Sequence, residues 1–144
     1  MAKDMKNKAK ESVNKTEVVT LRLDPRTKFG LELLAKKQYR TLSSVVEWSI
    51  NNALSTEIPD IDFIWDVSEV DRFLNMVKRA PTLLNYEEQL VLKVINDSYK
   101  CWDTDNESLD RIYIKENYGL IKKIALGEEK VSSLPNNISH DIPF

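Results

Sequence analysis

Residues 17–25 have the sequence EVVTLRLDP. Six of them form two alternating sets, and the pattern ends at Pro25. The sets are Val18, Thr20 and Arg22, and Val19, Leu21 and Leu23. No second strand-like segment lies near them in the chain. A single extended segment leaves its backbone donors and acceptors open along both edges, so it needs a partner strand. We therefore predict that this strand pairs, antiparallel, with the same strand of a second copy of the protein.

Two helices are predicted directly after the strand. Asp24 and Pro25 provide an N-cap and a first-turn proline for a helix over residues 26–38. Thr41 can cap a second helix over residues 42–54. The predicted order is strand, helix, tight turn and helix.

The charge is divided unevenly along the chain. The formal net charge is -2, but residues 1–55 carry eight Lys and three Arg against six Asp and Glu, a net charge of +5. Residues 56–144 carry ten basic against seventeen acidic residues, a net charge of -7. Residues 1–15 are rich in lysine and almost free of apolar residues, which predicts a flexible basic arm. This asymmetry favours contact between the front of the chain and a polyanion.

At residues 16–55 the sequence resembles the ribbon-helix-helix family of DNA-binding proteins. The resemblance is carried by Val19, Leu21 and Leu23 alternating with Val18, Thr20 and Arg22, by Asp24 and Pro25, by Leu31, Leu34 and Ala35, and by Arg40, Thr41, Leu42, Ser43, Val45, Val46 and Ile50. It implies an intertwined homodimer in which each copy gives one strand and two helices. Tyr39 stands where many members have glycine, so we expect an uncommon backbone conformation at this turn.

The resemblance also implies how DNA is contacted. Successive strand residues point to opposite faces, so Val18, Thr20 and Arg22 would point outward together and make the base contacts in the major groove. The predicted phosphate contacts are Lys8, Lys10, Lys15, Arg40, Thr41, Leu42, Ser43 and Ser44. Those at the start of the second helix would use its free backbone N–H groups.

Two further groups of apolar residues are predicted to lie in protein interfaces. The expected dimer core consists of Val19, Leu21, Leu23, Leu31, Leu34, Val46 and Ile50. Phe29, Leu33 and Trp48 lie on other faces of the two helices, and three large apolar side chains there suggest a docking patch for the rest of the chain or for another subunit.

The rest of the chain is predicted to be helical and without a strand. Residues 56–127 form a helical module for oligomerisation or partner binding, and residues 128–144 form a tail. Ser68 can start one helix, and Asn85 with Glu88 gives a capping-box pattern for a long helix that carries Trp102. Another helical run covers residues 109–127, with a kink or break expected at Gly119.

Composition argues against several enzyme classes. One cysteine, Cys101, and one histidine, His140, do not easily provide a metal cluster or a nucleophile–base pair. We expect Cys101 to be a buried small side chain inside an apolar helix. We therefore expect no catalytic site, no metal and no cofactor. The sequence shows no leader segment or membrane-spanning run, and we expect a cytoplasmic protein.

These observations predict a mostly α-helical, sequence-specific DNA-binding regulator of transcription. It would act as a homodimer or higher oligomer and repress by covering its operator. An antitoxin or adaptor, whose rear module binds a partner protein while the front autoregulates, is the leading alternative. An accessory factor for plasmid partition or DNA processing would use the same contacts.

Overall fold

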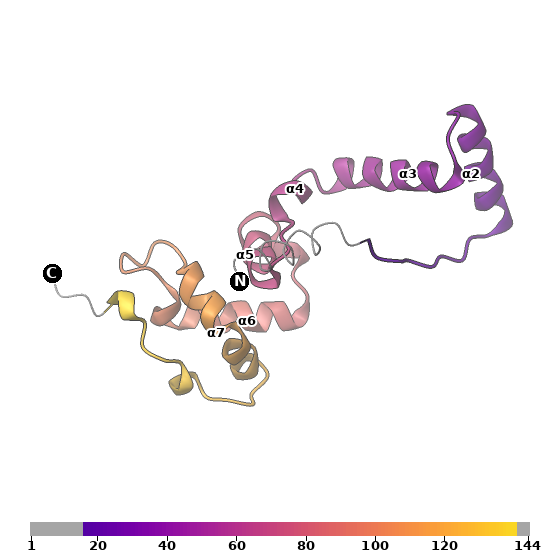
Figure 1. Cartoon of the computed structure of the whole chain (residues 1–144). Coiled ribbons are helices and arrows are strands. Elements are labelled where there is room, and N and C mark those ends of the chain that lie inside the picture. The colour runs from indigo at the N-terminus through magenta and orange to yellow at the C-terminus, as the bar shows by residue number, and fades with distance from the viewer. Residues whose placement is uncertain (1–15, 141–144) are drawn as a thin grey trace, which may run out of the picture. The chain divides into compact units, whose positions relative to one another are not determined.

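The computed structural model describes residues 16–140, and helices dominate this part of the chain (Figure 1). The chain divides into two compact units, Met1–Asp62 and Phe63–Phe144. The boundary lies seven residues after the one that the sequence predicts. Each unit is described separately below.

Unit 1 contains the two helices that the sequence predicts. α2 (Pro25–Lys37) begins after Asp24, whose carboxylate accepts a hydrogen bond from the Thr27 amide at 3.0 Å. α3 (Leu42–Glu57) begins after Thr41, whose hydroxyl oxygen accepts from the Ser44 amide at 3.2 Å. Both caps satisfy a backbone donor that the first helical turn leaves open.

The predicted strand is absent. Residues 16–24 are not a strand, and no strand occurs elsewhere between residues 16 and 140. The ribbon of the predicted fold is therefore wrong for this chain. The alternation of side chains depends only on the type of each residue. A strand also requires a hydrogen-bonded neighbouring strand, and no segment within residues 16–140 provides one.

The turn between α2 and α3 has the backbone conformation that the sequence predicts. Tyr39 has φ of 52°, in the left-handed region that costs a residue with a β-carbon about 1–2 kcal/mol. Its side chain is 97% exposed, so no packing offsets this strain. The Arg40 amide closes the turn by donating to the Ala35 carbonyl at 3.0 Å.

Unit 2 is built from helices and short 3₁₀ turns (η). In chain order it contains α5 (Glu69–Arg79), η1 (Pro81–Leu83), α6 (Tyr86–Asp97), η2 (Tyr99–Cys101), α7 (Arg111–Ala125), η3 (Val131–Ser133) and η4 (Ile138–His140). The short α4 (Ile61–Ile64) lies at the boundary between the units along the chain. Ser68 caps α5, and Asn85 with Glu88 forms the predicted capping box of α6.

The core of unit 2 forms where α7 packs against α5 and α6. Ile95, Ile114 and Ile121 are fully buried there. Cys101 is also fully buried, which confirms its predicted place in the core, and burial raises the pKa of its thiol to about 11. On the surface, Asp71 of α5 accepts hydrogen bonds from Lys115 of α7 at 2.6 Å and from Arg111 at 3.2 Å.

Three local predictions in unit 2 need correction. α6 ends at Asp97, so Trp102 lies outside it, and Cys101 lies in η2 rather than in a long helix. The Trp102 indole N–H turns back to donate to the Ile95 carbonyl at 3.2 Å. Gly119, a predicted kink or break, lies within a continuous α7.

The segment after α7 packs on unit 2 as far as the structure describes it. Leu134 is buried, and its carbonyl accepts from Lys100 Nζ at 2.7 Å. The Tyr113 hydroxyl donates to the Pro135 carbonyl, and Asn137 Nδ2 donates to the Lys100 carbonyl at 2.8 Å. Residues 134–137 are thus held by contacts distant in the sequence.

None of the helices in residues 16–140 is both long enough and apolar enough to cross a membrane.

Candidate nucleic-acid interface

Unit 1 has almost no core of its own. Ala35 of α2 and Val45 of α3 are the buried residues of its described part, residues 16–62. Much of α3 extends past α2 without another helix of unit 1 beside it (Figure 1). Helices of 13 and 16 residues are marginal in water without tertiary packing, so unit 1 needs a further surface to be stable.

The residues predicted for the dimer core are exposed or half-buried in the single chain. Val19, Leu21, Leu23 and Ile50 are exposed, while Leu31, Leu34 and Val46 are half-buried. Their place in a dimer core stays a prediction.

The predicted docking patch is also accessible. Phe29 and Leu33 of α2 and Trp48 of α3 are exposed. Trp48 borders a depression of about 240 Å³ on α3 that Arg40 and Ser44 also line. The patch therefore lies beside polar side chains of the α3 N-terminal half.

The side chain of Gln38 lowers the stability of unit 1 further. Its side-chain oxygen Oε1 is buried but has no hydrogen-bond partner in the described part of the chain. A buried acceptor without a donor costs about 1–3 kcal/mol.

The predicted base-contact residues lie on the exposed segment that precedes α2. Val18, Thr20 and Arg22 are all exposed, so each is free to meet an outside partner. Three of the predicted phosphate contacts, Lys8, Lys10 and Lys15, fall outside the described residues.

The remaining predicted phosphate contacts meet at the N-terminus of α3. Thr41 caps the helix, and the Val45 amide donates to the Thr41 carbonyl at 3.0 Å. The amides of Leu42 and Ser43 belong to the first turn, where an α-helix gives no internal acceptor. The side chains of Arg40 and Ser43 are exposed beside them. This end of α3 thus offers amide, hydroxyl and guanidinium donors together.

Sequence reasoning missed two further basic residues at this place. Lys36 and Lys37 occupy the last turn of α2, directly before the turn that carries Arg40. All three side chains are exposed. The signal was visible as three cations within five residues, next to a helix start.

The cations in the described part of unit 1 form no ion pair with a carboxylate of residues 16–140. Residues 16–62, the described part of unit 1, contain six Lys and Arg and seven Asp and Glu, so the argument depends on where the cations lie and not on the net charge. Within residues 16–140, all ion pairs join side chains of unit 2. The basic groups around α2 and the α3 N-terminus are therefore available to an outside anion.

Comparisons of the chain with protein-family models, with curated proteins and with solved structures found no match. The family resemblance of residues 16–55 remains an expectation from their sequence.

Proposed function

We propose that two copies of this chain bind double-stranded DNA through unit 1, and that the protein represses transcription by covering its DNA site. The observation that carries the proposal is a group of cations, Lys36, Lys37 and Arg40, next to the open N-terminus of α3. None of them forms an ion pair within residues 16–140. A phosphate group fits such a place, because free amides and a helix dipole both favour negative charge.

A second copy is the partner that best completes unit 1. Its apolar side chains are exposed on the segment before α2 and on both helices, and only two residues of its described part are buried. Two identical copies can cover the same surface on each other through a twofold axis. Twofold symmetry would also place two α3 N-termini on two half-sites of DNA.

Arg22 is the residue from which we expect sequence discrimination. It is exposed on the segment before α2, and a guanidinium can donate two hydrogen bonds to O6 and N7 of guanine. Arg40 lies at the α3 N-terminus, where a phosphate contact would act on every sequence alike.

The test begins with selection of the preferred site from random DNA by the full chain. Affinity for that site and for scrambled DNA is then measured at two salt concentrations for the wild type, Arg22→Ala, Arg40→Ala and Lys93→Ala. Lys93 is an exposed lysine of α6 in unit 2, so its replacement removes the same charge away from the proposed surface.

We expect a different result for each variant. Arg22→Ala should reduce discrimination by about 1–3 kcal/mol for each base contact removed. Arg40→Ala should weaken binding to both DNAs and reduce the salt slope by about 1 for each phosphate group that the guanidinium no longer neutralises. Lys93→Ala should bind as the wild type does. Equal losses in Arg40→Ala and Lys93→Ala, or the absence of DNA binding by the wild type, would refute the proposal.

A further inference from the structure

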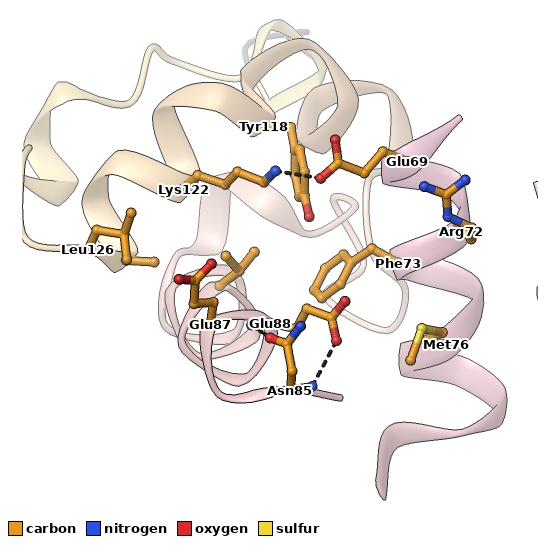
Figure 2. Close-up of a pocket in the computed structure, with 12 residues that line it drawn as sticks. Glu69, Arg72, Phe73, Met76, Asn85, Glu87, Glu88, Tyr118, Lys122 and Leu126 are labelled. Carbon is orange, nitrogen blue, oxygen red and sulfur yellow. Dashed lines mark hydrogen bonds and ion pairs between the residues drawn. The ribbon is translucent and has the colours of Figure 1, made fainter. Parts of the chain in front are cut away.

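A cavity of about 270 Å³ opens between α5, α6 and α7 in unit 2 (Figure 2). Phe73 of α5, Val91 of α6 and Tyr118 of α7 line it and are all buried. Pockets that bind small molecules measure about 300–1,000 Å³, so this one suits a ligand at the small end of that range.

Tyr118 is the residue that points to a ligand. It is only 8% exposed, and its ring packs against Phe73 with the ring centroids 5.8 Å apart. Figure 2 shows its hydroxyl directed toward the α6 side of the cavity. That hydroxyl has no hydrogen-bond partner among residues 16–140. The ring is buried but the hydroxyl oxygen is open to the cavity, so a ligand in the cavity can form a hydrogen bond with it.

The hydroxyl stays protonated under ordinary conditions. Burial raises the pKa of Tyr118 to about 12, and the nearby carboxylates of Glu69 and Glu88 act in the same direction. The hydroxyl is therefore neutral near pH 7 and can both donate and accept a hydrogen bond.

The two cations at the rim are already engaged. Lys122 forms an ion pair with Glu69 at 2.5 Å, and its ammonium lies 4.8 Å from the centre of the Tyr118 ring. Arg72 donates to the Asp66 carbonyl at 3.1 Å, and its guanidinium lies 5.1 Å from the Trp65 ring centroid. Glu69 thus neutralises Lys122, whereas Arg72 keeps its charge, because its hydrogen bond goes to a carbonyl and it forms no ion pair within residues 16–140.

Two carboxylates of α6, Glu87 and Glu88, outnumber Arg72, the one cation of the rim without an ion pair in the described chain, so the net charge there is negative. Glu87 forms no ion pair or hydrogen bond with any described residue. Glu88 uses one carboxylate oxygen to accept from the Asn85 amide at 2.8 Å, which leaves the other oxygen available. The Glu88 carboxylate of this capping box already places a negative charge at the α6 N-terminus, which disfavours an anion there.

We propose that this cavity binds a small organic cation, namely a primary amine attached to a body about the size of one aromatic ring. The apolar body lies against Phe73 and Val91. The ammonium donates to the free oxygen of Glu88 and to the hydroxyl oxygen of Tyr118, and Glu87 attracts it from the rim through its charge. All the lining residues belong to unit 2, so the inference does not rest on the proposed DNA binding.

The test uses the full chain and three compounds of similar size. Phenethylamine is the cation, 2-phenylethanol is its neutral counterpart and 3-phenylpropionate is an anion. Calorimetry or ligand-observed NMR should give saturable binding of the amine with a dissociation constant of about 1 mM or below. The alcohol and the carboxylate should bind about tenfold more weakly or not at all, because they lack the charge that the α6 carboxylates attract.

Two variants and two matched controls locate the site. Glu87→Gln and Tyr118→Phe each remove one polar partner while keeping most of the side-chain volume, and each should weaken amine binding about tenfold. Glu116→Gln and Tyr99→Phe make the same chemical changes at exposed positions outside this cavity and should bind the amine as the wild type does.

Three results would overturn the proposal. They are no saturable binding of phenethylamine, equal binding of 3-phenylpropionate, and unchanged amine binding in both Glu87→Gln and Tyr118→Phe. Glu87 is exposed, so the Gln variant keeps the test decisive even if Tyr118→Phe lowers the stability of unit 2.

Discussion

Replacement of Ile50 tests whether unit 1 requires a second copy. Ile50 lies on α3 and is 50% exposed in the single chain, so about half of its surface remains for a partner to cover. Full burial of an isoleucine side chain is worth about 1.5–3 kcal/mol, which makes the missing half worth about 1 kcal/mol. A twofold dimer contains two such residues. Ile50→Ala should therefore destabilise the dimer by about 2 kcal/mol and raise its dissociation constant about thirtyfold.

Sedimentation equilibrium over a range of protein concentrations would measure this change. Ile112→Ala is the matched control, because Ile112 is 73% exposed on α7 of unit 2 and is outside the proposed interface. Its dissociation constant should equal that of the wild type. Far-ultraviolet circular dichroism in parallel should show a fall in helix content on dilution of Ile50→Ala, since α2 and α3 have little packing of their own.

The reasoning would be refuted by a wild-type chain that remains monomeric at high concentration and keeps its full helix content. It would also be refuted if Ile50→Ala and Ile112→Ala dissociated alike. In either case the exposed apolar side chains of unit 1 would not be an interface between copies.

Four further predictions concern folding and reactivity. Tyr39→Gly should raise the thermal midpoint of unit 1, because the relief of about 1–2 kcal/mol of left-handed strain exceeds the roughly 0.5–1 kcal/mol of added chain entropy. The hydrogen bond from Lys115 is the main cause that lowers the pKa of Asp71 from 3.8 to about 2, so Asp71 should stabilise unit 2 above pH 4. Denaturant titrations at pH 7 and pH 3 should show a loss of stability in acid, and Asp71→Asn should lack this loss. Ile114→Ala should lower the unfolding free energy of unit 2 by about 2–5 kcal/mol in urea titrations, since Ile114 is fully buried. Cys101 should react with a thiol reagent at pH 8 only after denaturation, because its thiol is buried and has a pKa of about 11.

The helix starts were predictable because their signals are local. Thr41, Ser68 and the Asn85–Glu88 pair each bond a residue three positions away, and the structure has all of these caps. The end of α6 was not predictable in this way. It depends on Trp102 reaching back across η2 to the Ile95 carbonyl, a contact that periodicity does not encode.

The strand failed for a related reason. The pattern of residues 17–25 depends on that segment alone, whereas a strand forms only when a second segment bonds to its backbone. The described part of the chain has no second segment that pairs with it. The unit 2 cavity was missed because its lining comes from three helices that meet only after folding. Tyr118 appeared in the sequence as one more aromatic residue on a helix, and only its burial beside an open space distinguishes it.

The contacts of residues 134–137 affect when unit 2 can finish folding during synthesis. Leu134, Pro135 and Asn137 close over Lys100 and Tyr113, which precede them by 22 to 37 residues. Translation adds about 5–20 residues per second, so residues 134–137 are made roughly a second after α7. Until they leave the ribosome, α7 lacks the contacts that they make. Unit 1 emerges earlier, yet it has little core to bury on its own. We therefore expect the nascent chain to be a client of chaperones, with unit 2 the first part to reach a stable fold.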